Sequence, residues 1–200
     1  MHPSRSILYS VRLTGLVLVL GSLSSCTTLD ATGQSPLPAA FRLTSPGLAD
    51  NGMLSPKNAG NSKANPNCTG ENVSPPLAWF DAPPQTRSFA IMVHDQSGRN
   101  GLGVSHWIAY GIPANAAGLS EGEANAASSK YVGGANIYGA PQYAGPCPVR
   151  NGAPQHYVFT LVATDLEPGA LKPGLDQQAL LAALTGHNLG AASLVLRYAQ

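Results

Sequence analysis

Charged residues are scarce in this chain of 200 residues. Lys, Arg, Asp and Glu make up 10% of it, against about a quarter in an ordinary soluble domain, and the formal net charge is +1. A protein that binds the phosphate backbone of a nucleic acid needs Lys and Arg gathered on one face, and this sequence contains no such cluster. We therefore expect no nucleic-acid partner.

Long apolar segments are also missing. No uninterrupted apolar run reaches the roughly 18 residues that a membrane-spanning helix requires. What the chain does contain is 22 Gly and 17 Pro, which interrupt long helices and supply turns. The hydrophobic share of 44% and the length fit one domain with a single core. These properties favour a loop-rich β protein.

The N-terminal segment has the pattern of an export signal. Two arginines and no acid precede an apolar stretch at residues 13–20, and small residues follow it. The Leu-Ser-Ser-Cys sequence at residues 23–26 resembles the bacterial lipobox, in which the cysteine becomes the lipidated N-terminus. We interpret residues 1–25 as a lipoprotein signal peptide and Cys26 as the lipidation site. The alternative is an ordinary signal peptide that contains a cysteine.

A lipid-anchored protein needs a spacer between its anchor and its folded part. Residues 26–40 have too little apolar surface to fold and are expected to form a flexible tether, which leaves residues 41–200 as the domain. Each buried CH₂ of an acyl chain contributes about 0.8 kcal/mol, so several chains hold a protein on a membrane without crossing it. Thr27 follows the cysteine where an acid would be a retention signal, which suggests the outer membrane of a bacterial cell envelope, facing the periplasm.

Several short segments of the domain have strand patterns. Residues 41–45 alternate apolar and polar side chains, and the turn dipeptide at residues 51–52 follows them, which predicts an opening hairpin. Continuous apolar runs at residues 88–93, 107–110 and 157–163 predict three core strands.

The end of the domain combines one helix with a closing strand. Asp176 is a suitable N-cap for a helix that extends to Thr185, and Gly186 supplies a stop. Residues 194–198 then have the pattern of a final strand. We therefore expect a mostly β chain, folded as an antiparallel β-sandwich with a small C-terminal helical addition.

Each of the three core runs has a histidine at one end: His94, His106 and His156. Asp95 follows the first run, and strand ends can converge in space. A carboxylate at Asp95 that accepts from the His106 imidazole would fix its tautomer and raise its imidazolium fraction, leaving the other ring N–H to bind an anion. The alternative is a set of ordinary histidines at the rim of a sheet.

Two other kinds of site find little support in the sequence. Neighbouring strand residues such as His94 and Asp95 point to opposite faces, and no HExxH or CxxC spacing accompanies them, so we expect no metal and no cofactor. Ser105 next to His106 does not form a GxSxG elbow, so we expect no enzymatic activity, and an unrecognised hydrolase is the third hypothesis for function.

Beyond Cys26, the sequence contains an even number of cysteines. Cys68 and Cys147 both lie in segments rich in Gly and Pro. In an exported chain such a pair predicts a disulfide, and the alternative is two buried thiols.

The order of the motifs resembles a known family. The segments are 72–79 (Asn-Val-Ser-Pro-Pro-Leu-Ala-Trp), 88–95, His106-Trp107, 143–148 (Tyr-Ala-Gly-Pro-Cys-Pro) and 156–159. Together they are similar to the phosphatidylethanolamine-binding protein family, and more narrowly to its bacterial YbhB/YbcL branch, often labelled Raf kinase inhibitor-like. The resemblance covers about residues 41–198.

The resemblance implies a β-sandwich with a small pocket that holds phosphate, phosphoethanolamine, acetate or a similar anion, without an established catalytic cycle. Asp95 and His106 match family positions that line this pocket, and Trp79 would pack beneath it. The segment that closes its rim contains Tyr143, Gly145 and Pro146.

Two positions depart from the family pattern. The family's Asp-Pro-Asp segment is Asp95-Gln96-Ser97 here, so the second carboxylate is missing. Where the family commonly has a histidine, this chain has Gln155 followed by His156, and either of the two could face the ligand. A neutral amide at that position would weaken anion binding and reduce its pH dependence.

The sequence thus predicts a lipid-anchored envelope protein with a pocket for a small phosphate-type anion. Its expected partners are that anion and, through the lipid anchor, a membrane, and a protein is a further candidate partner. The alternative is a protein-interaction or inhibitor module with a vestigial pocket.

Overall fold

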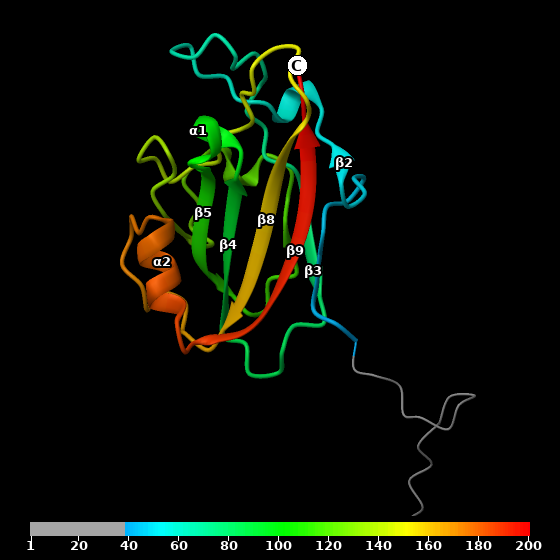
Figure 1. The fold of residues 1–200 in the computed structure, drawn as a ribbon. Helices are drawn as coiled ribbons and strands as arrows, with labels where there is room; N and C mark the ends of the chain where they lie inside the picture. The colour runs from blue at the N-terminus through cyan, green and yellow to red at the C-terminus, as the bar shows by residue number, and fades with distance from the viewer. Residues whose placement is uncertain (1–38) are drawn as a thin grey trace, which may run out of the picture. The chain divides into compact units, whose positions relative to one another are not determined.

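Two β-sheets pack face to face in the computed structural model, which describes residues 39–200 (Figure 1). These residues form one unit, and Phe41 already packs against its core. The predicted signal peptide, the Cys26 lipidation site and nearly all of the tether lie outside the described residues.

The larger sheet has six strands in the order β2-β9-β8-β4-β5-β7. Their bounds are β2 Gly52–Met53, β4 Ser88–Asp95, β5 Val104–Pro113, β7 Val132–Gly133, β8 Gln155–Thr164 and β9 Asn188–Tyr198. The smaller sheet has the order β1-β3-β6, with bounds Arg42–Thr44, Leu77–Phe80 and Gly118–Leu119. Every neighbouring pair is antiparallel except β2 with β9. The predicted mostly β sandwich is confirmed.

Strand β4 is covered on both faces. Phe89, Ile91 and Val93 join the core between the two sheets, whereas Ala90 and Met92 join a second core. Two leucines of helix α2 (Gln177–Leu184) complete that second core. Period-two alternation with apolar residues on both faces explains why the sequence here is a continuous apolar run.

The helices are short. Helix α2 begins where the Asp176 carboxylate accepts from the Ala179 backbone N–H at 2.8 Å, and it ends before Gly186, whose φ is +83°. The predicted helix is therefore confirmed with its cap and its stop. Helix α1 (Gly98–Gly101) is a single turn, and 3₁₀ turns occur at Pro56–Asn58 and Glu123–Asn125. Neither helix in residues 39–200 has the length and apolar character needed to cross a bilayer.

The predicted opening hairpin is wrong. Strand β1 pairs with β3 in the smaller sheet, and β2 pairs in parallel with β9 in the larger one. Contacts made by Asp50 and Asn51 explain the difference, because the Asp50 carboxylate and the Asn51 backbone both bond to Val195 of β9. These bonds carry the chain from one sheet to the other instead of turning it back on itself.

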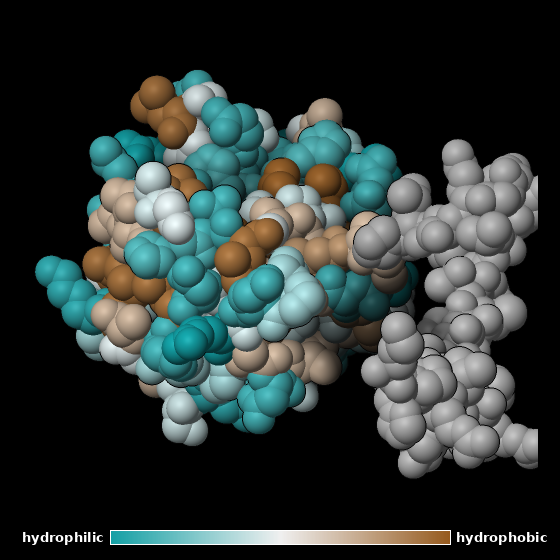
Figure 2. Space-filling model, turned by 90° about the horizontal axis from the view of Figure 1, so that it is seen from below, coloured by the Kyte–Doolittle hydropathy of each residue, from teal (hydrophilic) through white to brown (hydrophobic). Residues whose placement is uncertain are grey.

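Strand β4 runs from one end of the sandwich to the other, from Ser88 to Asp95. Figure 2 shows the end at which β4 begins and β8 ends, where apolar side chains are scattered among hydrophilic ones. Trp79 packs near this end, with its ring 5.4 Å from that of Phe89 in the second position of β4. The expected place of Trp79 beneath the pocket is therefore wrong, because Asp95, which was expected to line that pocket, lies at the other end of β4.

Candidate functional site

Three neighbouring strands have a terminus at the same end of the larger sheet. Asp95, the last residue of β4, lies opposite Val104 at the start of β5 and Tyr157 near the start of β8. A cavity of about 350 Å³ opens at this end of the sheet, beside the α1 turn. It brings together four of the predicted site residues: Asp95, His106, Gly145 and Gln155.

A β-bulge turns His106 into this cavity. Val93 of β4 lies opposite Trp107, but the next residue, His94, lies opposite Ser105, so His106 is the extra residue of β5. Regular alternation would have placed His106 on the face of Ile108, under α2. A bulge re-aims a side chain in this way, and bulges occur often beside functional sites.

The His106 ring is held by a backbone carbonyl. Its Nδ1 lies 2.6 Å from the Ala144 carbonyl oxygen, and because a carbonyl can only accept, Nδ1 carries the hydrogen. The prediction that Asp95 orients His106 is wrong. The Asp95 Oδ1 atom instead accepts from the Ser97 N–H at 2.9 Å and from the Ser97 hydroxyl at 2.7 Å. Ser97 is two residues away, so this local Asx-type turn captures the carboxylate oxygen.

Burial governs the charge of His106. It lowers the pKa of His106 below 6.5, and the Ala144 hydrogen bond and the negative charge of Asp95 offset only part of that effect. The expected rise in imidazolium is therefore wrong, because desolvation outweighs the nearby carboxylate. Near pH 7 the ring is neutral, with the Nε2 lone pair left for the cavity.

Gln155, and not His156, faces the cavity. Gln155 lines it, whereas His156 is exposed and lies outside it. The Tyr157 hydroxyl donates to the Gln155 Oε1 atom at 3.2 Å, which leaves the Gln155 amide N–H groups available. Tyr157 also meets the His106 ring edge-on, with centroids 5.1 Å apart. Burial raises the pKa of Tyr157, so its hydroxyl stays protonated and remains a donor.

Two predicted rim residues lie behind the cavity wall. Tyr143 is buried, and its hydroxyl donates to the Asn58 carbonyl at 3.1 Å, while the Pro146 carbonyl accepts from the Gly60 N–H at 2.8 Å. Neither lines the His106 cavity. Both hold the segment that contains Gly145, which has no room for a side chain because a Cβ would collide with the Asn58 carbonyl oxygen.

A disulfide fixes one wall of the cavity. Cys68 and Cys147 are joined, with their Cα atoms 4.7 Å apart. Cys147 lines the cavity directly, and Asn65 lies on the loop that the bond attaches. The bond therefore joins two loops that are 79 residues apart in the sequence.

The sequence analysis did not assign several residues of the site, among them Ser97, Arg99 and Tyr157. Period-two alternation from Gln155 would have placed Tyr157 on the same face. No sequence signal places Arg99, which lies in the α1 turn with a φ of +53°, beside Asn100 with a φ of +60°. Such backbone conformations are uncommon for residues other than glycine and cluster at functional sites. No group of three or more His, Cys, Asp or Glu side chains suited to a metal ion occurs within residues 39–200.

Comparisons with known proteins identify the family of the chain. A family model described as "Phosphatidylethanolamine-binding protein" matches residues 44–199. A UPF0098 protein of Methanothermobacter thermautotrophicus is 35% identical over 133 residues, which cover 66% of this chain and 85% of that protein. The UPF0098 protein YbcL of Escherichia coli is 35% identical over 104 residues, 50% of this chain and 57% of that protein.

Solved structures show the same fold. The crystal structure of E. coli YbcL, described as a member of the mammalian PEBP family, covers 81% of this chain and 99% of its own, with a TM-score of 0.72 and 26% identity. A phosphatidylethanolamine-binding protein homologue from Chlamydia trachomatis covers 80% of this chain and 98% of its own, with a TM-score of 0.68 and 29% identity.

Proposed function

Because this chain belongs to the phosphatidylethanolamine-binding protein family and is of the YbhB/YbcL, Raf kinase inhibitor-like kind, we propose that its His106 cavity binds a small phosphate-type anion. Phosphate and phosphoethanolamine are the ligands that fit this chemistry. The observation that carries the proposal is the bulge in β5, which aims into the cavity an imidazole whose Nε2 makes no hydrogen bond within residues 39–200.

The other polar groups of the cavity suit a phosphate ester. The Gln155 amide and the Arg99 guanidinium are donors for phosphate oxygens, and Arg99 adds a positive charge. The Asp95 Oδ2 atom makes no hydrogen bond within residues 39–200, so it can accept from a P–OH group or from an ammonium group. His106 takes up a proton when the anion binds, since the ion pair offsets the cost of charging a buried ring.

Isothermal titration of the full chain with phosphate and with phosphoethanolamine tests this function. We expect binding of both, and a loss of at least tenfold in affinity in His106→Ala, because hydrogen bonds to charged groups contribute about 1.5–3 kcal/mol. His156→Ala is the matched control, since His156 is exposed outside the cavity, and it should bind as the unaltered chain does. Absence of binding, or binding that His106→Ala leaves unchanged, would refute the proposal.

We further propose that Cys26 anchors the protein to a membrane of the bacterial envelope, at the outer membrane. Fractionation of cells that express the full chain tests the anchor. The unaltered chain should sediment with membranes, and Cys26→Ala should appear in the soluble fraction, because acyl chains supply the membrane affinity. Equal membrane association of both chains would contradict it.

A protein-interaction or inhibitor role is the second candidate, and it rests on the rim of the cavity. Two large apolar side chains that line the cavity are exposed, Val149 by 63% and Tyr138 by 61%, and Leu102, which follows the α1 turn, is exposed by 79%. Pull-down from envelope extract distinguishes the roles, because a partner captured by the unaltered chain and by His106→Ala, but not by Leu102→Asp, favours interaction over ligand binding.

We propose a binding role and no catalytic one. A serine nucleophile needs a histidine base within hydrogen-bond reach, and no serine hydroxyl of residues 39–200 bonds to the His106 ring, whose hydrogen-bond partner is the Ala144 carbonyl. His106-dependent turnover in a screen of esterase and phosphatase substrates would reverse this assignment.

A further inference from the structure

A second cavity, of about 250 Å³, adjoins the His106 cavity. The two share Tyr138, Gly145 and Cys147 in their walls. The second cavity differs sharply in chemistry, because no Asp, Glu, Lys, Arg or His side chain of residues 39–200 lines it. Five of its lining residues carry side-chain amides: Asn61, Asn72, Asn125, Asn136 and Gln142. We call it the amide cavity.

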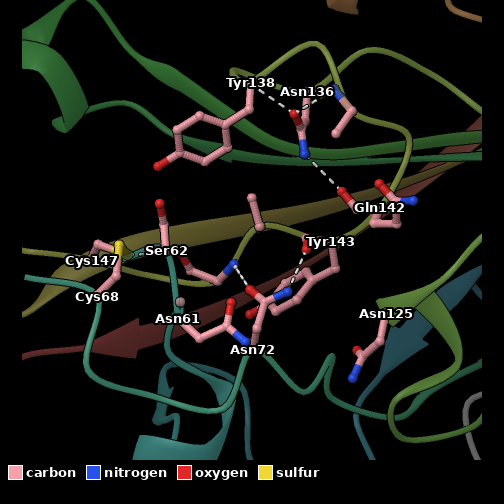
Figure 3. Close-up of a pocket in the computed structure, with 14 residues that line it drawn as sticks. Asn61, Ser62, Cys68, Asn72, Asn125, Asn136, Tyr138, Gln142, Tyr143 and Cys147 are labelled. Atoms are coloured by element: carbon pink, nitrogen blue, oxygen red, sulfur yellow. Dashed lines mark hydrogen bonds between the residues drawn. A yellow bond between two sulfur atoms is a disulfide. The ribbon is translucent and has the colours of Figure 1, made fainter. Parts of the chain in front are cut away.

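Two of these amides build the frame of the amide cavity. Asn72 donates to the Tyr143 carbonyl at 2.8 Å and accepts from the Gly145 N–H at 2.7 Å. Asn136 accepts from the backbone N–H groups of Tyr138 and Ala140 and donates to the Gln142 carbonyl. These bonds fix the two loops on opposite sides of the cavity, as the dashed lines in Figure 3 show.

Other polar groups of the amide cavity are not used by the fold. The side chains of Gln142 and Ser62 and the Tyr138 hydroxyl make no hydrogen bond within the described part of the chain. Asn125 uses only its Oδ1 atom, which accepts from the Ser74 N–H at 2.9 Å. Figure 3 shows Tyr138 and Ser62 near the disulfide at one end of the cavity, and Gln142 and Asn125 toward the other end. These donors and acceptors belong to side chains that line the same cavity.

We propose that the amide cavity binds a neutral, hydroxyl-rich ligand, a single sugar ring or a polyol of similar size. Amides and hydroxyls both donate and accept, so they complement sugar hydroxyls, which do the same. An anion would meet amide oxygens without a compensating cation, and a metal ion would lack carboxylates. Pockets for drug-sized ligands begin near 300 Å³, so about 250 Å³ suits one ring.

Tyr138 adds the remaining feature of such a site. Tyr138 lines the amide cavity and is 61% exposed, so its ring is accessible to a ligand from the solvent. An aromatic ring with a polar tip can cover the C–H face of a sugar while its hydroxyl bonds to the ring substituents. This proposal does not rest on anion binding at His106.

Side-chain amide resonances give a direct readout of this site. The full chain, labelled with ¹⁵N, is titrated with D-glucose and with N-acetyl-D-glucosamine, and the Asn and Gln NH₂ signals are followed by NMR. We expect millimolar binding with shifts concentrated at Gln142 and Asn125, and no tighter binding of D-glucuronate. Gln142→Ala should weaken binding about fivefold, the effect of one neutral hydrogen bond.

The controls separate this site from the fold and from the His106 cavity. Gln178→Ala removes an exposed glutamine of α2, far from the amide cavity in the sequence, and should leave sugar binding unchanged. If Gln142→Ala fails to fold, Ser62→Ala replaces it. No shift with either sugar, or shifts that persist at full affinity in the folded cavity variant, would overturn the proposal. Phosphate shifts at His106 without sugar shifts would reject the sugar site and retain the anion site.

Discussion

His106 shows at the scale of one residue how burial and charge compete. The ring lies in a site that lowers its pKa below 6.5, whereas the unfolded chain titrates near that value. Below pH 6.5 the unfolded state therefore binds more protons than the folded state, and the free energy of unfolding decreases as the pH falls. An anion that binds the protonated ring should offset part of this loss.

Urea unfolding measured from above pH 6.5 down to about pH 5 tests this pH dependence. His106→Gln should make the stability of the domain less dependent on pH in this window. Sulfate, which does not titrate there, should stabilise the unaltered chain more at the acid end, and should do so little in the variant. A profile that is identical in both chains would contradict the role of His106.

Gln155 offers a gain-of-function test at the same scale. Gln155→His would place a second titratable group on the face of the cavity that already holds His106. We expect tighter phosphate binding at acid pH and little change at alkaline pH, because a protonated imidazole adds a charge that an amide cannot supply. Titration calorimetry at two pH values checks the result, and His156→Gln, outside the cavity, is the control. A pH dependence no steeper than that of the unaltered chain, in which His106 alone titrates, would show that position 155 does not contact the anion.

Single residues also show where sequence reasoning stops. The order of the motifs placed Asp95 and His106 at one site, since antiparallel strands bring their ends together. It could not decide between Gln155 and His156, because that choice depends on strand register, nor could it show the bulge at His106. The sequence analysis also assigned the Asp95 carboxylate to His106. The Ala144 carbonyl that holds the ring comes from a loop 38 residues away in the sequence, and no local pattern indicates that contact.

At the scale of elements, signals within a few residues were sufficient to predict where an element forms, but they did not indicate which distant strand it pairs with. Helix α2 could be predicted because its cap and its stop are encoded within a few residues of its ends. Strand β1 forms where expected, but its partner is β3, and Gly52, which was expected in a turn, begins β2 beside β9, far along the chain. A turn dipeptide at residues 51–52 therefore gave the position of a bend without giving the pairing.

The N-cap of α2 provides a test at this scale. Asp176→Ala should lower the free energy of unfolding by about 1 kcal/mol, because the Ala179 N–H loses its acceptor. Asp176→Asn, which keeps a capping oxygen, should lose much less. Urea unfolding of both variants gives the comparison, and phosphate binding should be the same in both because α2 lies away from the cavity. Equal destabilisation by both substitutions would point to the charge of Asp176 and not to its cap.

At the scale of the whole domain, rigid strands support sites whose walls are loops. The His106 cavity and the amide cavity share walls from the segments around residues 60–72 and 136–149, which contain no strand or α-helix. The Cys68–Cys147 disulfide and the two hydrogen bonds of Asn72 hold these segments together. Sequence composition indicated a loop-rich protein but not which loops would meet, because their contacts span more than 70 residues.

Loss of the disulfide should therefore affect stability and both sites together. In the chain-entropy model, releasing a cross-link between residues 79 apart lowers the free energy of unfolding by about 4 kcal/mol. Cys68→Ala combined with Cys147→Ala should show this loss in urea unfolding, with weaker binding of phosphate because the wall at Cys147 is released. If the double variant loses stability but binds phosphate normally, the loops are positioned by Asn72 and the backbone hydrogen bonds, and the disulfide acts on the unfolded chain alone.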